Sequence, residues 1–408
     1  MPMSISLFTA ALAIYSLAPT AFAAQEAAPL EPAKEPIPTP SALLSEPLPL
    51  KFSGKLENDW SFYSADKSVE QVTDQFDSGT EFRRARFGMS GGYGDWLKFK
   101  ASYDLQGDGS GFSDLYSEFD GMPGNSKLKF GHFKEPFSLE TLTSSTSLTF
   151  LERSMLKGFA PSRNVGVQVR DTAFKKKMTW AAGLFRETDA GAFGVDESGQ
   201  LEFALTGRVT WLPIWENDGE TLLHLGLAAS FRNPDEAEVS YRARPESHLA
   251  PSLLDTGDFL ADDVILIGTE AAWVYGPATI QGEYAQAMVR RPNGENDVNF
   301  QAGYLLAAWM WTGETREYRR SRGYFGGITP SQPFAGNGGG SGAWETALRY
   351  SFADYSDDNI GGGEGQILMA AVNWHLTEHL RISMDYGIAD LVTHGNAHIL
   401  QFRFHLDW

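Results

Sequence analysis

The chain contains no cysteine, which excludes a disulfide framework as the source of its stability. Beyond residue 24 it has no run of eighteen apolar residues, which excludes a membrane-spanning helix there. Positive charge is scarce, since 33 Lys and Arg oppose 52 Asp and Glu and give a formal net charge of −19. This balance argues against nucleic acid as a partner. The fold must therefore be held by backbone pairing and packing.

The first residues lack Lys and Arg, yet they have two other features of a secretory signal. Ile5–Ala18 is mostly apolar, and Ala21-Phe22-Ala23 offers small residues at the spacing that a signal peptidase recognises. We expect a signal peptide over 1–24. Residues 25–50 are rich in Pro and poor in aromatics, which predicts an extended periplasmic linker. The remaining chain, 51–408, is expected to be one outer-membrane β-barrel.

The end of the chain alternates without a break. Leu400, Phe402, Phe404, Leu406 and Trp408 would point one way, while Gln401, Arg403, His405 and Asp407 would point the other. A strand with one apolar and one charged face that ends on an aromatic residue is typical of the closing strand of an outer-membrane barrel. The 42 Gly and 11 Trp fit many strands, tight turns and aromatic belts.

Strand-like segments continue through the whole of the predicted barrel. Sixteen are found, at 51–63, 81–93, 96–106, 113–120, 127–135, 164–171, 177–186, 201–212, 221–232, 264–275, 278–289, 298–312, 343–354, 365–375, 380–389 and 398–408. The fold class is therefore all-β, a transmembrane antiparallel β-barrel in the bacterial outer membrane, with lipid as its surroundings. An even number places both ends of the barrel on one side of the membrane.

The connections alternate between short and long, as they do in such barrels. Short turns are expected at 94–95, 122–126, 216–220 and 276–277, and long loops at 64–80, 136–163, 187–200 and 233–263. Eight tryptophans would form one belt near the periplasmic strand ends: Trp96, Trp180, Trp211, Trp215, Trp273, Trp311, Trp374 and Trp408. The exception is 313–342, a long connection on the short-turn side.

The face opposite the apolar residues would line the pore. Its basic residues would be Arg84, Arg86, Lys98, Lys100, Lys127, Lys129, Arg170, Arg208, Arg232, Arg349, Arg381 and Arg403. Its acidic residues would be Asp104, Glu270, Glu283, Glu345, Asp385 and Asp407. A narrow pore with net positive walls concentrates anions whatever the total charge of the chain. The alternative is that loop carboxylates pair with these cations, which would leave a weakly selective pore.

Several motifs resemble the phosphate-selective outer-membrane porins, the porin O and P family. They run in order from Phe82-Arg83-Arg84-Ala85-Arg86 through Lys129–Glu140 and Thr149–Arg153 to Gly342–Glu345. The resemblance implies a sixteen-stranded barrel, usually a homotrimer, that passes phosphate or related small anions by diffusion. In this family the third and fifth external loops and one long periplasmic connection fold into the channel. Those segments would be 136–163, 233–263 and 313–342.

The resemblance also implies roles for individual residues. Arg84 and Arg86 would lie on the pore wall with Arg83 near them, and Ser144, Ser145 and Arg153 on the constricting third loop. Arg242 and Arg244 would lie on the fifth loop, and Arg316, Arg319, Arg320 and Arg322 on the periplasmic connection. One departure stands out, because 141–149 contains no Lys or Arg where the narrowest point of a phosphate channel would have a cation. This departure favours the alternative function, a general diffusion porin of low selectivity.

No catalytic residues, metal site or cofactor are predicted. His375-Leu-Thr-Glu378-His379 has the spacing of one class of zinc peptidase, which needs both His on one helical face. Here the motif lies between two alternating strands, so a polar turn is the better interpretation. The eight His are scattered and none accompanies a nucleophile motif, so the chain is not expected to be an enzyme.

Overall fold

The computed structural model describes residues 49–72, 76–106, 111–188, 203–234, 238–336, 338–392 and 395–408. The predicted signal peptide, nearly all of the predicted linker and most of the predicted loop 187–200 lie outside these residues.

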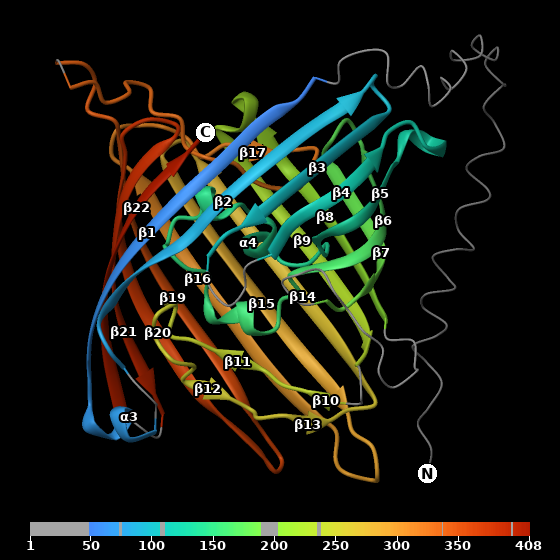
Figure 1. Cartoon of the computed structure of the whole chain (residues 1–408), viewed down its shortest axis with the longest axis vertical. Helices are drawn as coiled ribbons and strands as arrows, with labels where there is room; N and C mark the ends of the chain where they lie inside the picture. Colours follow the sequence, from blue (N-terminus) through green and yellow to red (C-terminus); the bar gives the residue numbers. More distant parts are fainter. Residues whose placement is uncertain are drawn as a thin grey trace. The chain divides into compact units, whose positions relative to one another are not determined.

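The described residues form a closed antiparallel barrel of sixteen strands (Figure 1). The strands are β1 (Lys51–Ala65), β2 (Gly79–Tyr93), β3 (Leu97–Asp104), β4 (Gly111–Phe119), β5 (Lys127–Lys134), β6 (Arg163–Ala173), β7 (Met178–Arg186), β8 (Phe203–Glu216), β9 (Thr221–Asn233), β14 (Asp263–Tyr275), β15 (Ala278–Arg290), β16 (Val298–Met310), β19 (Ala343–Asp357), β20 (Ile360–His375), β21 (Leu380–Leu391) and β22 (Gly395–Asp407). Each predicted segment corresponds to one of them. Pairing of β1 with β22 closes the sheet, so the last alternating segment is the closing strand.

In the described ranges the connections hold short elements. They are α3 (Lys67–Val72), α4 (Leu139–Leu142), η1 (Pro123–Asn125), η2 (Ser145–Ser147), η3 (Met155–Gly158) and η4 (Asn217–Gly219). Three small two-stranded sheets join β10 (Glu238–Val239) to β13 (Phe259–Leu260), β11 (Arg242–Ala243) to β12 (Leu254–Asp255), and β17 (Tyr318–Arg319) to β18 (Tyr324–Phe325). No helix in the described part of the chain is long and apolar enough to cross a membrane.

The alternation of side chains sorts the two faces of the wall. On β22, Phe404 is 46% exposed on the outside, while its neighbour Arg403 is 1% exposed inside the barrel. Leu305 and Leu348, on other strands, are exposed in the same way as Phe404. Because the side-chain period of a strand is two, one register places every apolar residue of such a strand on the lipid side.

Two loops fold back against part of the inner wall. We call residues 135–162, between β5 and β6, loop A and residues 234–262, between β9 and β14, loop B. Phe159 of loop A packs on Tyr241 of loop B, with ring centroids 5.3 Å apart, and on Tyr355 of β19 at 4.9 Å. These rings join one apolar cluster with inner residues of β14–β16 and β19–β22, such as Phe300. The loops therefore fill one side of the barrel and leave the other side open.

Candidate functional site

The open side of the barrel contains a cavity of about 1870 Å³. Its walls are the inner faces of β1–β8, parts of loops A and B, and the connection 311–342, with the last two residues of the chain. Among the described residues the lining includes sixteen Lys and Arg: Lys55, Arg83, Arg84, Arg86, Lys100, Lys129, Lys134, Arg153, Lys157, Arg163, Arg170, Arg208, Arg242, Arg244, Arg319 and Arg322. It includes eight Asp and Glu: Glu81, Asp104, Asp114, Glu152, Asp171, Glu246, Glu317 and Asp407.

A β-bulge places three arginines of β2 at this cavity. The register of β1 against β2 shifts so that Glu57 faces Arg84 and Asn58 faces Phe82, which leaves Arg83 as the extra residue. Strict alternation would put only Arg84 and Arg86 inside, whereas a bulge turns two consecutive side chains to one face. Arg83, Arg84 and Arg86 consequently all line the cavity.

Asn58 occupies the outer side of the same bulge. Its Nδ2 donates to the carbonyl oxygen of Glu81 at 3.0 Å, and its Oδ1 accepts from Nε1 of Trp60 at 2.8 Å. A polar side chain facing lipid is unfavourable unless it is hydrogen-bonded. Asn58 therefore fits this position, because its amide donates to the carbonyl group of Glu81 and accepts a hydrogen bond from the Trp60 indole.

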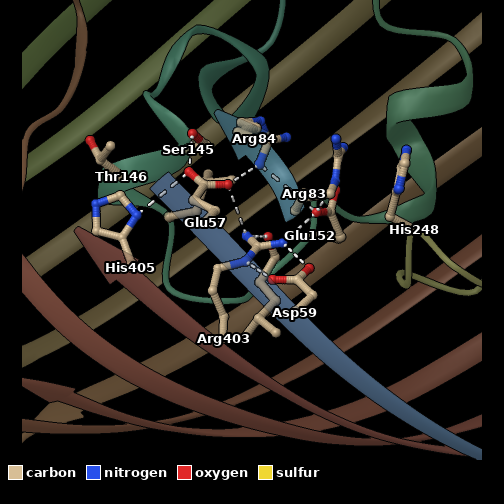
Figure 2. Close-up of polar contacts among 12 residues, drawn as sticks. Glu57, Asp59, Arg83, Arg84, Ser145, Thr146, Glu152, His248, Arg403 and His405 are labelled. Atoms are coloured by element: carbon tan, nitrogen blue, oxygen red, sulfur yellow. Dashed lines mark hydrogen bonds and ion pairs between the residues drawn. The ribbon is translucent and has the colours of Figure 1, made fainter. Parts of the chain in front are cut away.

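The arginines of the bulge form ion pairs with one carboxylate of loop A and one of β1 (Figure 2). Arg83 donates through Nε and Nη2 to both carboxylate oxygens of Glu152, at 2.8 and 3.2 Å. Arg84 donates to Glu57, which also accepts from the Ser145 hydroxyl at 2.9 Å. Burial alone would raise the pKa of Glu152, but Arg83, Arg84 and Arg403 hold the pKa of this loop carboxyl well below its usual range. Both Arg83 and Glu152 are therefore charged in this ion pair.

Four cations of the lining have no carboxylate partner among the described residues: Lys134, Arg153, Lys157 and Arg244. The first two donate to backbone carbonyls of loop A, for example from Arg153 Nη2 to the Thr143 oxygen at 2.8 Å. Arg244 donates to the carbonyl oxygen of His248.

The backbone N–H of Lys157 donates to the Ser154 oxygen at 3.0 Å, but its ammonium group makes no hydrogen bond or ion pair with any residue that the structure describes. The side chain is exposed to the cavity. Burial first, and then the nearby charges of Arg153, Arg163 and Arg83, lower the pKa of the Lys157 ammonium to about 8. Burial, followed by the charge of Arg84, lowers the pKa of Arg153 to about 10. The cation that 141–149 lacks is therefore supplied by the same loop a few residues later.

Eleven of the fourteen predicted site residues line the cavity: Arg83, Arg84, Arg86, Lys100, Lys129, Ser144, Ser145, Arg153, Arg208, Arg242 and Arg244. Lys98 instead forms an exposed pair with Asp120 at 2.7 Å. Arg232 is held by Glu135 at 3.1 Å and by Glu187 at 3.2 Å. Arg403 is covered by loop A and donates to Asp59 and to the carbonyl oxygen of Leu151. The inward direction predicted for Arg232 and Arg403 is correct. Neither lines the cavity, because carboxylates hold Arg232 and loop A covers Arg403.

The sequence analysis missed several residues of the site. Lys134 was missed because it interrupts the alternation of β5. Asp114 was missed although it has the same phase as Tyr116 and Glu118 on β4, and the bulge at the β3–β4 pairing leaves Ser113 as the extra residue. Glu57 was missed although the charged Lys55, Glu57 and Asp59 alternate with Leu56, Asn58 and Trp60 on β1, a signal that could have found it. Asp114 pairs with Lys100 and Arg163, and Glu118 with Arg170. The strand carboxylates are thus more numerous than predicted.

The connection 311–342 lies against the wall at several points. Arg208 donates to the carbonyl oxygen of Gly323 at 2.6 Å, and Tyr318 hydrogen-bonds Nδ1 of His224 at 2.6 Å. Arg316 reaches the carbonyl oxygen of Ser147 in loop A at 2.9 Å. Of the four arginines expected on this connection, Arg319 and Arg322 line the cavity, while Arg320 stacks on Trp215 at 4.6 Å. The connection therefore contacts loop A through Arg316.

The peptidase-like spacing at 375–379 has no helix. His375 ends β20, and the residues 376–379 that follow form bends before β21. Among the described ranges no group of three or more His, Asp or Glu has the arrangement of a metal site.

Comparison with known proteins gives consistent matches. A family described as phosphate-selective porin O and P matches residues 50–403. Porin O of Pseudomonas aeruginosa is 26% identical over 394 residues, covering 85% of this chain and 84% of that protein. Two solved structures share the fold: the trimer form of OmpT of Vibrio cholerae (TM-score 0.54, 14% identity, 89% of this chain and 100% of that one) and the anion-selective porin of Comamonas acidovorans (0.53, 13%, 89% and 100%).

Proposed function

The chain belongs to the phosphate-selective porin O and P family and is a channel of the bacterial outer membrane, and we propose that this channel passively conducts anions, with phosphate or related oxyanions preferred. The porin family and fold point to a channel rather than to an enzyme. The preference for anions is argued from the cavity, and the preference for phosphate from the chemistry of its donors.

The charge of the cavity lining carries the proposal. Sixteen Lys and Arg against eight Asp and Glu line the cavity of a chain whose formal net charge is −19. In a narrow space with low-dielectric walls, such a surplus raises the local concentration of anions and excludes cations. Exposed acidic residues act weakly on the pore, because salt screens exposed charges beyond about 8 Å. Buried carboxylates next to the lining, such as Glu57, Glu118 and Glu270, pair with lining cations and reduce the surplus.

The donors near loop A suit an oxyanion. Arg153 and Arg83 offer planar sets of N–H groups that match two oxygens at once. The hydroxyl of Ser144, which is exposed, adds a neutral donor that binds weakly. Lys157 adds an exposed charge whose ammonium group has no partner in the described structure. Permeation needs binding that replaces part of the water around the anion and still permits release. A mixture of strong and weak donors meets both requirements.

A homotrimer is part of the proposal. The Vibrio cholerae relative in fold is described in a trimer form. For this chain the test is the mass of the detergent-extracted complex, measured by light scattering before and after heating.

The function is tested on the refolded protein in a planar bilayer. We expect the reversal potential across a KCl gradient to show selectivity for chloride, and added phosphate in the millimolar range or below to reduce the chloride current. Selectivity without reduction of the current would support an anion channel that does not prefer phosphate.

One observation favours a second function, a general diffusion porin of low selectivity. Twelve of the sixteen lining cations lie within 4.0 Å of a carboxylate, as Arg86 does with Asp104 at 2.7 Å. Such pairing weakens the field in the cavity. A reversal potential near zero together with an unaffected chloride current would identify this function.

A further inference from the structure

One carboxylate of the cavity, that of Glu152 in loop A, contacts three guanidinium groups (Figure 2). Its Oε1 lies 2.8 Å from Arg83 Nε, 2.8 Å from Arg403 Nη2 and 4.0 Å from Arg84 Nη1. The side chain is 14% exposed and lines the cavity. Glu57 also pairs with Arg84, but it is fully buried on the inner face of β1 and does not line the cavity. Glu152 therefore both lines the cavity and contacts the two arginines of the bulge, Arg83 and Arg84.

The backbone on either side of Glu152 is fixed by residues behind it. The N–H of Leu151 donates to Asp385 at 2.8 Å, and the carbonyl oxygen of Leu151 accepts from Arg403 at 2.5 Å. The carbonyl oxygen of Glu152 accepts from Arg349 at 3.0 Å. These contacts come from β19, β21 and β22, on the far side of loop A. The backbone at Glu152 is thus fixed, and the side chain can leave Arg83 only by giving up its ion pairs with Arg83 and Arg403.

Glu152 uses only part of the donors of Arg83. The carboxylate accepts from Nε and from one N–H of Nη2. A guanidinium has five N–H groups, so three remain available, and Arg83 keeps 19% of its side chain exposed. An anion that approaches Arg83 therefore shares it with a fixed negative charge only a few ångströms away.

We propose that Glu152 is a specificity-determining residue, a fixed counter-charge that competes with the permeating anion for Arg83 and Arg84 and so sets how tightly the channel holds it. This role rests on the proposed function, because it assumes that anions pass these arginines. Without the counter-charge the two arginines would attract anions more strongly and release them more slowly. The residue would thus limit affinity in favour of throughput.

The test is Glu152→Gln, which keeps the size of the side chain and one oxygen acceptor for Arg83. We expect the chloride-to-potassium permeability ratio to rise about threefold and the dissociation constant for phosphate block to fall about tenfold, the factor that corresponds to about 1.4 kcal/mol. The maximal phosphate current should fall because release slows. An unchanged or lower permeability ratio in a refolded Glu152→Gln channel would overturn the proposal.

Glu345→Gln is the matched control. Glu345 is also a buried carboxylate, paired with Arg316 and Asn373, but it does not line the cavity. Removing its charge should change the permeability ratio less than about twofold, because the charge lies behind loop A. An equal rise in both variants would mean that total interior charge, and not Glu152, sets the ratio.

The double variant Arg83→Gln with Arg84→Gln shows whether Glu152 acts through these arginines. In that background Glu152→Gln should change the permeability ratio by less than about twofold, since contacting residues couple. A full threefold rise there would contradict the proposal. If Glu152→Gln does not refold, Glu152→Ala replaces it, because it removes the same charge and keeps the backbone hydrogen bonds of residues 151 and 152. It should also raise the ratio, and a ratio at or below that of the wild type would overturn the proposal.

The same recordings separate this inference from the proposed function. A wild-type channel without anion preference or phosphate block defeats the proposed function, whatever Glu152→Gln does. A wild-type channel that prefers anions and is unchanged by Glu152→Gln defeats only the role of Glu152.

Discussion

The arginines on the inner wall have different uses in two regions of the barrel. On β1–β8, which we call the cavity half, Arg83 and Arg86 keep part of their side chains exposed to the cavity. On β19–β22, which we call the anchor region, Arg349, Arg381 and Arg403 are almost fully buried. All three of these donate to backbone carbonyls of loop A, at Glu152, Leu148 and Leu151.

The difference teaches that an inward arginine does not by itself indicate an ion pathway. A loop folded into a barrel has carbonyl groups that need donors, because buried backbone groups without partners are costly. Arginine supplies five donors and reaches far from the strand. The anchor region thus fixes loop A in place, while the arginines of the cavity half are exposed to the permeating ions.

Removal of an anchor should have the largest effect. Arg349 contacts Glu140 at 3.0 Å and also Glu246, linking loops A and B to β19. Arg349→Met should destabilise the barrel by about 3–5 kcal/mol, because two buried carboxylates lose their partner. Thermal unfolding in detergent measures this loss, and single-channel conductance should rise as the loops loosen. Lys98→Met, at an exposed pair, is the control; equal loss in both would contradict the anchor role.

Changes in the cavity half should alter selectivity more than stability, because the buried Glu57 keeps Arg403 at 3.6 Å when Arg84 is removed. Arg84→Ala with Arg86→Ala should lower the chloride-to-potassium permeability ratio several-fold without preventing insertion, since two charges leave the lining. The reversal potential across a KCl gradient gives the ratio. Unchanged selectivity in the double variant would show that these arginines do not act on the permeating ion.

Lys157 should make the anion selectivity of the cavity half sensitive to pH. Its ammonium, with a pKa of about 8, is charged below that pH and loses its charge as the pH rises through it. Anion selectivity in KCl should therefore decline between about pH 7 and pH 9. Lys157→Gln should lower the ratio at pH 6.5 and flatten the profile, which reversal potentials across this range would show. Lys176→Gln, in the exposed turn after β6, is the matched control and should keep the decline.

The smallest expected effect is on the lipid-facing side of the cavity half. Asn58→Leu removes the donor to the Glu81 carbonyl and should cost about 1 kcal/mol of stability. If the bulge relaxes, Arg83 turns away from the cavity and the permeability ratio falls slightly. Asn299→Leu, at an outward position of β16, serves as the control. A loss of stability without any shift in selectivity would separate Asn58 from the placement of Arg83.

The sequence predicted the wall well and the interior incompletely. Alternation on segments such as 398–408 identified the strands, because one register separates apolar from polar residues across a membrane. It also put Arg403 on the inner face. It could not distinguish Arg403 from Arg84, because what covers each depends on loop A, whose path through the barrel has no periodic signal. Lys134 was missed because it breaks the alternation of β5.

By itself the sequence determined the barrel, its number of strands and the side of each strand that meets lipid, because these follow from a two-residue period and from turn spacing. The tertiary structure alone decided which cations face open space. A one-residue bulge brought Arg83 beside Arg84, and a folded loop brought Glu152 to them from about seventy residues away along the chain. Pore charge is a sum over segments distant in sequence, so it exists only once the chain is folded.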